Sequence, residues 1–257
     1  MKSKIIILGS GSSMGVPRAD GYWGKCNPKE KKNFRSRCSA LISNKYFNIL
    51  IDSSPDLRAQ LIKNKIKSID YVLYTHGHGD QTHGINDLRV FSLKSKKKID
   101  IFADNRTLKH LIKNFSYCFK NTHDYPAILK ANKLKKNIKF SYAKQFIEIK
   151  SVTVKHGNIN SIAYIINNEC AYASDVNHIF DKDLKNFFNL KYLIIDCLRL
   201  NPHPAHFNLE DVLNLVKLTK PKKTILTNLH ADLDYNYLLK ILPKNVIPAY
   251  DGLSLNL

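Results

Sequence analysis

The chain has 257 residues, and a chain of this length can bury a substantial core without disulfides or a structural metal. Its 41 lysine and arginine residues against 21 aspartate and glutamate residues give a formal net charge of +20, which favours polyanionic partners over basic ones. No apolar run approaches the ~20 residues of a membrane-spanning helix, so the sequence predicts a cytoplasmic protein without a membrane partner.

Ten short runs rich in β-branched residues, each bounded by glycine, asparagine or aspartate, predict β-strands. The first strands follow one another closely, and the later ones alternate with helical segments. This order predicts an α/β protein with two sheets covered by helices, in a single domain over residues 1–257. The predicted strands cover residues 4–8, 39–43, 47–52, 70–75, 99–103, 146–156, 161–167, 170–175, 191–196 and 223–228.

Two segments between these strands carry clear helix signals. Residues 54–65 begin with Ser54 as a capping residue and place Pro55 in the first turn. Residues 208–220 begin with Asn208 as a capping residue and place apolar side chains on one face. Both segments are predicted to be helices.

The basic charge is carried mostly by lysine, since 34 of the 41 basic residues are lysines. They occur with abundant isoleucine and asparagine, which indicates a lysine-biased composition spread over the surface rather than a dedicated basic face. The lysine-rich run over residues 130–139 accordingly predicts a solvated loop or an insertion, with a substrate-binding arm as the alternative.

The seven arginines are more informative because they are rare in this chain. Five lie in or beside segments that carry glycine and histidine, where a planar guanidinium can grip a phosphate or a carboxylate. We expect three of them to bind substrate, with structural ion pairs as the alternative for each. The five are Arg35 and Arg37 together with the three expected substrate ligands Arg18, Arg89 and Arg199.

The cysteines are odd in number and widely spaced, and no C-x-x-C pair indicates a zinc ribbon or a redox centre. We therefore expect five reduced thiols. They are Cys26, Cys38, Cys118, Cys170 and Cys197.

The stretch from Tyr74 to Gly84, YTHGHGDQTHG, is the strongest functional signal in the chain. His76 and His78 are two residues apart at the end of a predicted strand, so both imidazoles point to the same side and can meet one ion. Gly77 and Gly79 are expected to leave room for that ion, and Asp80 follows. Two histidines and a carboxylate cannot complete a tetrahedral shell, so the motif requires further ligands elsewhere.

Three further candidates lie where a predicted strand gives way to a loop, the position from which a sheet presents functional groups. His156 ends the strand over residues 146–156, and Asp175 ends the strand over residues 170–175. His230 comes shortly after the last predicted strand.

The motif THGHGD, followed by a later His, Asp and His in that order, resembles the metallo-β-lactamase superfamily. The stretches GSGSSMGVPRADGYWGKC, ILIDSSPDLR, HGINDLR and HADLDY are similar to the branch that contains the phosphoribosyl cyclic phosphate phosphodiesterases, which is related to the tRNA 3′-processing endonucleases. The resemblance covers nearly the whole chain. It implies a four-layer αββα sandwich and one or two divalent metal ions, zinc or manganese.

The resemblance also implies roles for the ligands. His76, His78 and His156 would hold the first metal, Asp80 and His230 the second, and Asp175 would bridge both. One position departs from the family, since Gln81 stands where a histidine follows the aspartate. An amide oxygen binds zinc more weakly than imidazole, so the second site is expected to be weakened or to take a harder ion. His83 is an alternative ligand.

The expected chemistry is hydrolysis by a metal-bound hydroxide, because a divalent metal lowers the pKa of bound water to near neutrality. Asp80 would orient this nucleophile. By analogy with the same branch, His206 would protonate the leaving group as general acid, with His203 as the neighbouring alternative. The N-terminus of the predicted helix that Asn208 caps would favour an anion nearby.

A phosphodiesterase acting on a small or cyclic phosphodiester is the predicted function. An RNA-processing endonuclease related to the tRNA 3′-processing enzymes is one alternative, which the basic charge favours. A thioester or lactone hydrolase on the same fold is another. The expected partner is a small phosphodiester substrate rather than nucleic acid, and the sequence leaves self-association into a homodimer open.

Overall fold

The computed structural model describes residues 3–123, 125–143 and 145–257. The chain divides into two compact units. The first unit comprises the described residues of 1–9, 39–135 and 252–257, and the second comprises those of 10–38 and 136–251. The single domain over residues 1–257 stays a prediction.

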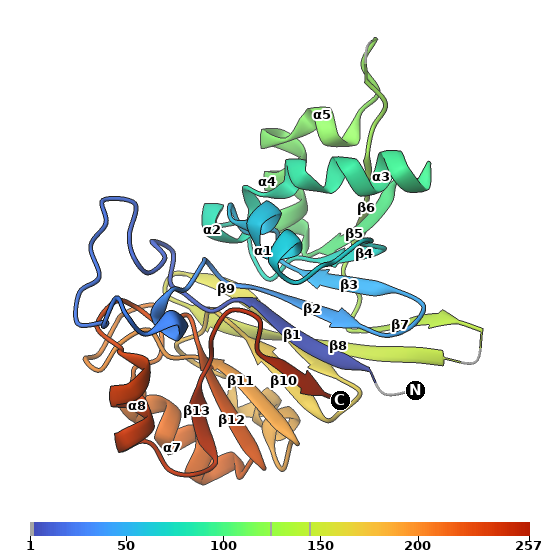
Figure 1. Cartoon of the computed structure of the whole chain (residues 1–257). Coiled ribbons are helices and arrows are strands. Elements are labelled where there is room, and N and C mark those ends of the chain that lie inside the picture. The colour runs from blue at the N-terminus through green and yellow to red at the C-terminus, as the bar shows by residue number, and fades with distance from the viewer. Residues whose placement is uncertain (1–2, 124, 144) are drawn as a thin grey trace. The chain divides into compact units, whose positions relative to one another are not determined.

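The first unit contains a seven-stranded sheet in the order β14-β1-β2-β3-β4-β5-β6 (Figure 1). Pairing is antiparallel from β14 to β3 and parallel from β3 to β6. The strands are β1 (Lys4–Gly9), β2 (Ser39–Ser43), β3 (Asn48–Ile51), β4 (Tyr71–Leu73), β5 (Ile99–Ala103), β6 (Leu129–Lys133) and β14 (Ser254–Asn256). The helical segments are α1 (Leu57–Lys63), α2 (Gly79–Thr82), η2 (Ile85–Leu88), α3 (Arg89–Ser95), α4 (Asn105–Asn114) and α5 (Ser116–Phe119).

The core of the first unit forms where these helices pack on one face of the sheet. Leu41, Leu50 and Val72 from neighbouring strands are fully buried in one cluster with Leu57 of α1 and Leu88 of η2. Burying apolar area of this kind is the main stabilising contribution to the fold. The cluster therefore holds α1 and η2 against β2, β3 and β4.

The second unit contains a seven-stranded sheet in the order β13-β12-β11-β10-β9-β8-β7. Pairing is antiparallel from β7 to β10 and parallel from β10 to β13. The strands are β7 (Asn137–Tyr142), β8 (Gln145–His156), β9 (Ile159–Ile166), β10 (Cys170–Ala173), β11 (Tyr192–Asp196), β12 (Lys223–Thr227) and β13 (Val246–Pro248). The helical segments are η1 (Lys31–Asn33), α6 (Asp181–Leu184), η3 (Lys185–Phe187), α7 (Leu209–Thr219) and α8 (Tyr235–Ile241).

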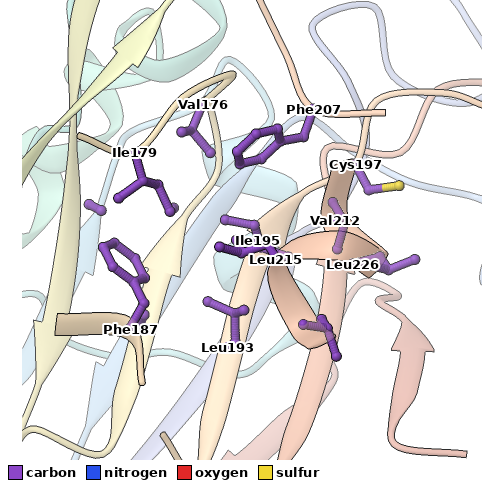
Figure 2. Packing of buried hydrophobic residues seen from close by; sticks show 14 of the residues in the cluster. Val176, Ile179, Phe187, Leu193, Ile195, Cys197, Phe207, Val212, Leu215 and Leu226 are labelled. Atoms are coloured by element: carbon purple, nitrogen blue, oxygen red, sulfur yellow. The ribbon is translucent and has the colours of Figure 1, made fainter. Parts of the chain in front are cut away.

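The core of the second unit lies between this sheet and its helices. Figure 2 shows Leu193 and Ile195 of β11 with Val212 and Leu215 of α7 and Phe187 of η3 in one cluster. Phe207 lies in the same cluster directly before α7, so packing fixes the position of the loop that leads into this helix.

All ten predicted strands form, with bounds that differ by a few residues. The lysine-rich run over residues 130–139, expected to be a solvated loop or an insertion, instead contributes to β6 and β7. Each of these strands lies at the edge of its sheet, so its lysine side chains stay in water while its backbone pairs with β5 or β8. The short strands β13 and β14 were not predicted.

The predicted helix over residues 208–220 is confirmed as α7. Asn208 accepts from the backbone N–H of Asp211, and the Asp211 side chain accepts from the N–H of Asn208, which completes a capping box. The helix predicted over residues 54–65 is shorter than expected and begins at Leu57. Ser54 is therefore not its cap, because the Ser54 hydroxyl accepts from the N–H of Asp56 within the preceding turn.

Two predictions from composition are tested by the structure. All five cysteines are free and buried, which confirms the absence of disulfides among them. Across the residues that the structure describes, no helix combines the length and the hydropathy that crossing a membrane requires.

Candidate metal centre

The H-x-H-x-D motif runs from the loop after β4 into the first turn of α2 in the first unit, so the predicted passage from a strand to a loop and a helix is confirmed. The rings of His76 and His78 lie 4.6 Å apart between centroids, in an edge-to-face arrangement. Asp80 and Gln81 occupy the first turn of α2, where Gln81 Nε2 lies 3.5 Å from Asp80 Oδ2. The motif therefore gathers two imidazoles, a carboxylate and an amide within one short segment.

The ring of His76 is oriented by a relay of buried polar groups. Asp52 accepts from the backbone N–H of Thr75 and from its hydroxyl, both at 2.8 Å. The same hydroxyl lies 3.0 Å from His76 Nδ1. Because the hydroxyl gives its only proton to Asp52, Nδ1 must carry a proton and donate to the hydroxyl oxygen. Nε2 is then the nitrogen that a metal would take.

Replacing Thr75 with valine should weaken metal binding about 10- to 100-fold, because an outer partner that orients a ligand contributes on that scale. Valine has nearly the same shape but cannot accept from His76 Nδ1. Competition with a chromophoric chelator would measure the change in affinity. Thr153→Val is the matched control, because Thr153 is exposed on β8. Unchanged affinity in Thr75→Val would show that the relay does not orient the ligand.

Of the two glycines of the motif, Gly79 is the one against which a neighbouring ring packs closely, and the room that both would leave for an ion stays a prediction. A Cβ at position 79 would come within 2.9 Å of His83 Cε1, and one at position 77 would lie 3.4 Å from His110 Cγ. The ring of His83 also packs edge-to-face on Phe115, with 5.7 Å between centroids. These contacts place His83 in the packing between the motif and the end of α4.

A second cluster lies in the second unit. His156 at the end of β8, Asp175 shortly after β10 and His206 just before α7 each present a ligand atom, and these three atoms lie within 4.8 Å of one another. His156 Nδ1 lies 2.7 Å from the carbonyl oxygen of Ala205, to which it can only donate. Nε2 of His156 is therefore the nitrogen that a metal would take.

His206 is held by a buried aspartate that the sequence analysis missed. His206 Nδ1 lies 2.6 Å from Asp196 Oδ2, and the Asn228 amide donates to Asp196 Oδ1 at 3.0 Å. Asp196 Oδ2 also accepts from the backbone N–H of Val176 at 2.9 Å. Burial raises the pKa of Asp196 to about 7, while the His206 ring acts in the opposite direction. Asp196 ends β11, so it occupies the same kind of strand-end position in the sequence as Asp175.

The other two histidines considered from sequence also lie in the second unit. His230 follows β12, and its Nδ1 lies 3.2 Å from Asp232 Oδ2. The ring centroid of His203 lies 5.0 Å from that of His206. Burial and the neighbouring His206 lower the pKa of His203. His206 is therefore close enough to His203 to disfavour a charge on the His203 ring.

The three arginines expected to bind substrate all have partners within their own unit. Arg18 pairs with Asp20, and its guanidinium lies 4.6 Å from the centroid of the Tyr22 ring. The Arg89 guanidinium lies 4.5 Å from the Tyr125 ring centroid. Arg199 donates to two carbonyls of its own loop, those of Asn201 and Pro202. Their contact with substrate stays a prediction.

The donor set fits a divalent metal. In His76 and in His156, Nδ1 faces a hydroxyl and a carbonyl respectively, so Nε2 of each ring is the nitrogen presented to a metal. Histidines that bind metals in proteins are held in this way through their second nitrogen. His230 Nδ1 lies near the Asp232 carboxylate without a hydrogen bond to it. The same donors and neighbouring carboxylates suit zinc and other borderline divalent ions.

Clusters of histidine and aspartate at the strand ends of an α/β fold are typical of metal-dependent hydrolases. A family model described as Beta-lactamase superfamily domain matches residues 47–228, which is more than half of the chain. The chain therefore belongs to the metallo-β-lactamase superfamily, whose fold implies binding of divalent metal.

Solved structures confirm the predicted α/β metallo-β-lactamase fold. A diphosphatase of the PhnP family is 28% identical and superposes with a TM-score of 0.90 over 100% of this chain and 98% of its own. Zinc-bound PqqB of Methylobacterium extorquens is 16% identical with a TM-score of 0.80, over 99% of this chain and 100% of its own. Human tRNase Z, short form, is 18% identical with a TM-score of 0.69, over 98% of each chain.

A relative in Porphyromonas gingivalis is named octanoyltransferase. It is 30% identical over 256 residues, which make up 98% of this chain and 51% of the relative. The chain thus spans about half the length of this relative.

Proposed function

We propose that this metallo-β-lactamase fold hydrolase is a phosphodiesterase that acts on a small or cyclic phosphodiester. The buried Asp196–His206 pair carries the proposal, because it places a positioned proton donor within 4.8 Å of the ligand atoms of His156 and Asp175. The similarity to a PhnP-family diphosphatase supports it, since that protein also acts on a phosphate substrate.

The proposed metal ligands follow the family resemblance. His76, His78 and His156 would hold one ion, Asp80 and His230 a second, and Asp175 would bridge them, with Gln81 in place of a second-site histidine. A bound ion would lower the pKa of water and polarise a phosphoryl oxygen. Either zinc or manganese is compatible with these donors.

The chain's own residues would perform the remaining steps. Asp80 would accept a hydrogen bond from the attacking water and orient it toward phosphorus. His206 would donate the proton on Nε2 to the departing oxygen, while Asp196 holds Nδ1 and stabilises the charged ring. The N-terminus of α7, which Asn208 caps two residues after His206, would favour the negative charge of the phosphate.

Hydrolysis assays on purified protein of known metal content would test this function. The substrate panel comprises a cyclic phosphate ester, a linear phosphodiester, a diphosphate, a precursor tRNA and an octanoyl thioester. We expect the first two to be cleaved fastest. Preferential cleavage of the diphosphate would move the substrate class toward that of the PhnP-family relative, and cleavage of the thioester alone would overturn phosphodiester hydrolysis.

Hydrolysis of an acyl thioester is a second candidate, favoured by the relative named octanoyltransferase. Only about half of that relative is matched, so its acyl-transfer activity can belong to the unmatched half. The same metal centre would polarise a thioester carbonyl as it would a phosphoryl group. The thioester arm of the panel separates the two candidates.

RNA cleavage remains the alternative that the net charge of +20 favours. If RNA is the substrate, binding of a precursor tRNA should weaken steeply with salt, because many phosphate contacts release counterions. For a small phosphodiester we expect a shallow salt dependence. A steep dependence together with cleavage at one site would favour the nuclease.

Replacing Gln81 with histidine should increase the affinity for the second ion or the metal content per chain, because imidazole binds these ions better than an amide oxygen does. Gln81 is buried in the first turn of α2 beside Asp80, where the new ring would lie next to an assigned ligand. Isothermal titration of the metal-free protein would measure the change. Superimposable titrations of the two proteins would show that position 81 does not contribute a ligand.

A further inference from the structure

A groove in the first unit is lined by residues of α1 and of the segment after it on one side, and by residues of η2 and α3 on the other. Its volume is about 620 Å³, and its lining is mainly apolar. Ile62 of α1 and Val90 and Leu93 of α3 contribute to this lining with 63%, 58% and 55% of their surface exposed. Three large aliphatic side chains exposed together in a groove are a feature of binding surfaces.

The inner side of the same segments is already used for folding. Leu57 and Leu61 of α1 and Leu88 of η2 are buried in the core of the first unit. The exposed residues Ile62, Val90 and Leu93 do not belong to this core, so they are not needed to hold these helices on the sheet. Their exposed apolar surface lowers solubility and does not stabilise the unit. A binding partner would remove this surface from water.

Positive charge surrounds the aliphatic lining. Arg58, Lys67 and Lys94 line the groove. Within the part of the chain that the structure describes, none of these three side chains forms an ion pair. Asp87 also lines the groove, and its carboxylate accepts from the backbone N–H of Arg58 rather than from the guanidinium. Arg58, Lys67 and Lys94 thus form a basic rim around the groove, and a partner can neutralise its charges.

We propose that this groove binds an acidic amphipathic helix of a partner protein. Its apolar face would cover Ile62, Val90 and Leu93, and its carboxylates would pair with Arg58, Lys67 and Lys94. Helices bind grooves in this way through apolar anchors spaced at i, i+3, i+4 and i+7. Charge complementarity at the rim gives the partner its acidic character.

Other occupants fit the groove less well. A second copy of the chain also carries a formal charge of +20 and the same basic rim, so a symmetric contact would oppose like charges. A membrane is a flat surface and would contact the rim more readily than the concave lining. A single acyl chain would remain largely in water, because the aliphatic side chains that would cover it are themselves more than half exposed.

Fluorescence anisotropy with a designed helical peptide would test the proposal on the full chain. The probe has about 18 residues, with leucines on one face and glutamates on the other. We expect saturable binding that weakens as salt rises. Leu93→Glu and Ile62→Glu should each weaken it at least about tenfold, because each removes an apolar anchor and adds a negative charge. Arg58→Glu should weaken it through charge alone.

Leu218→Glu is the matched control, because Leu218 is 52% exposed on α7 in the second unit. It should leave peptide binding within twofold of the wild type. All the variants change exposed positions, and thermal melting should show that each remains folded. A peptide of the same composition with its leucines distributed around the helix should bind at least tenfold more weakly.

Several results would overturn the proposal. Equal binding of the two peptides, or binding that Leu93→Glu leaves unchanged, would remove the groove as a helix site. A dimer in sedimentation that Leu93→Glu converts to the 29.5 kDa monomer would identify a second copy as the occupant. Cosedimentation with phosphatidylglycerol vesicles that requires Leu93 would identify a membrane surface instead.

Discussion

Removing the divalent metal is expected to reduce phosphodiester hydrolysis at least about a thousandfold, since the metal supplies both the activated water and the polarisation of phosphorus. The fold should persist, because each unit has its own buried apolar core. Dialysis against a chelator, followed by elemental analysis, activity assay and circular dichroism, would measure both effects. Adding back zinc or manganese should restore activity.

Replacing His76 with alanine should cause the same loss of metal and of activity as chelation does in the wild-type protein. His178→Ala is the matched control, because His178 is an exposed histidine to which we assign no ligand role. It should retain both metal and activity. A wild-type protein that holds no transition metal even after reconstitution would contradict the proposed enzyme, and full activity in His76→Ala would remove His76 from the ligand set.

Replacing His206 with alanine is expected to slow hydrolysis of a phosphodiester with a sugar leaving group by about 10²- to 10⁴-fold, the range for loss of a general acid. Hydrolysis of a nitrophenyl phosphodiester should fall much less, because nitrophenolate departs without a proton. Metal content should stay unchanged. Steady-state rates on the two substrates, with metal quantified in each preparation, would measure the difference.

Asp196→Asn provides a second test of the same proton donor. The substitution keeps the size of the side chain but removes the charge that stabilises the protonated His206 ring, so it should affect the two substrates in the same unequal way. If His206→Ala slows both substrates equally with metal intact, His206 binds phosphate or supports the loop. His203 would then be the next proton donor to test, through His203→Ala.

The local elements of the fold could be predicted from sequence because their signals are local. The strands that contain Leu50, Val72 and Ile194 follow from runs of β-branched and aliphatic residues, and α7 follows from its Asn208 cap and its apolar face. The lysine-rich strands β6 and β7 were not predicted, because their sequences carry no such local signal. Lysine does not favour a strand by itself, and pairing with β5 and β8 decides their conformation.

The metal-binding motif could also be predicted, because its residues lie within a few positions of one another. His76, His78 and Asp80 form a pattern in the sequence itself, and the strand-end positions of His156 and Asp175 follow from the predicted strands. The family resemblance, now supported by the match over residues 47–228, connects these groups to metal chemistry. Their individual roles as ligands stay predictions.

Only the tertiary structure identified the residues that orient these groups. β3 pairs in parallel with β4, with Ile51 opposite Leu73, so Asp52 comes to lie beside Thr75. In the second unit β11 pairs in parallel with β12, which places Asp196 opposite Thr227 and next to Asn228.

The sequence by itself therefore determined ten of the strands, the main helix and the candidate ligands, because each is encoded by neighbouring residues or by a short motif. The tertiary structure alone decided that Asp52 orients the His76 ring through Thr75 and that Asp196 orients the His206 ring. Asp52 lies 23 residues from Thr75, and Asp196 lies 10 residues from His206 and 32 from Asn228. Contacts over such separations depend on which strands become neighbours and in which register, and hydrophobic packing of the whole unit sets both.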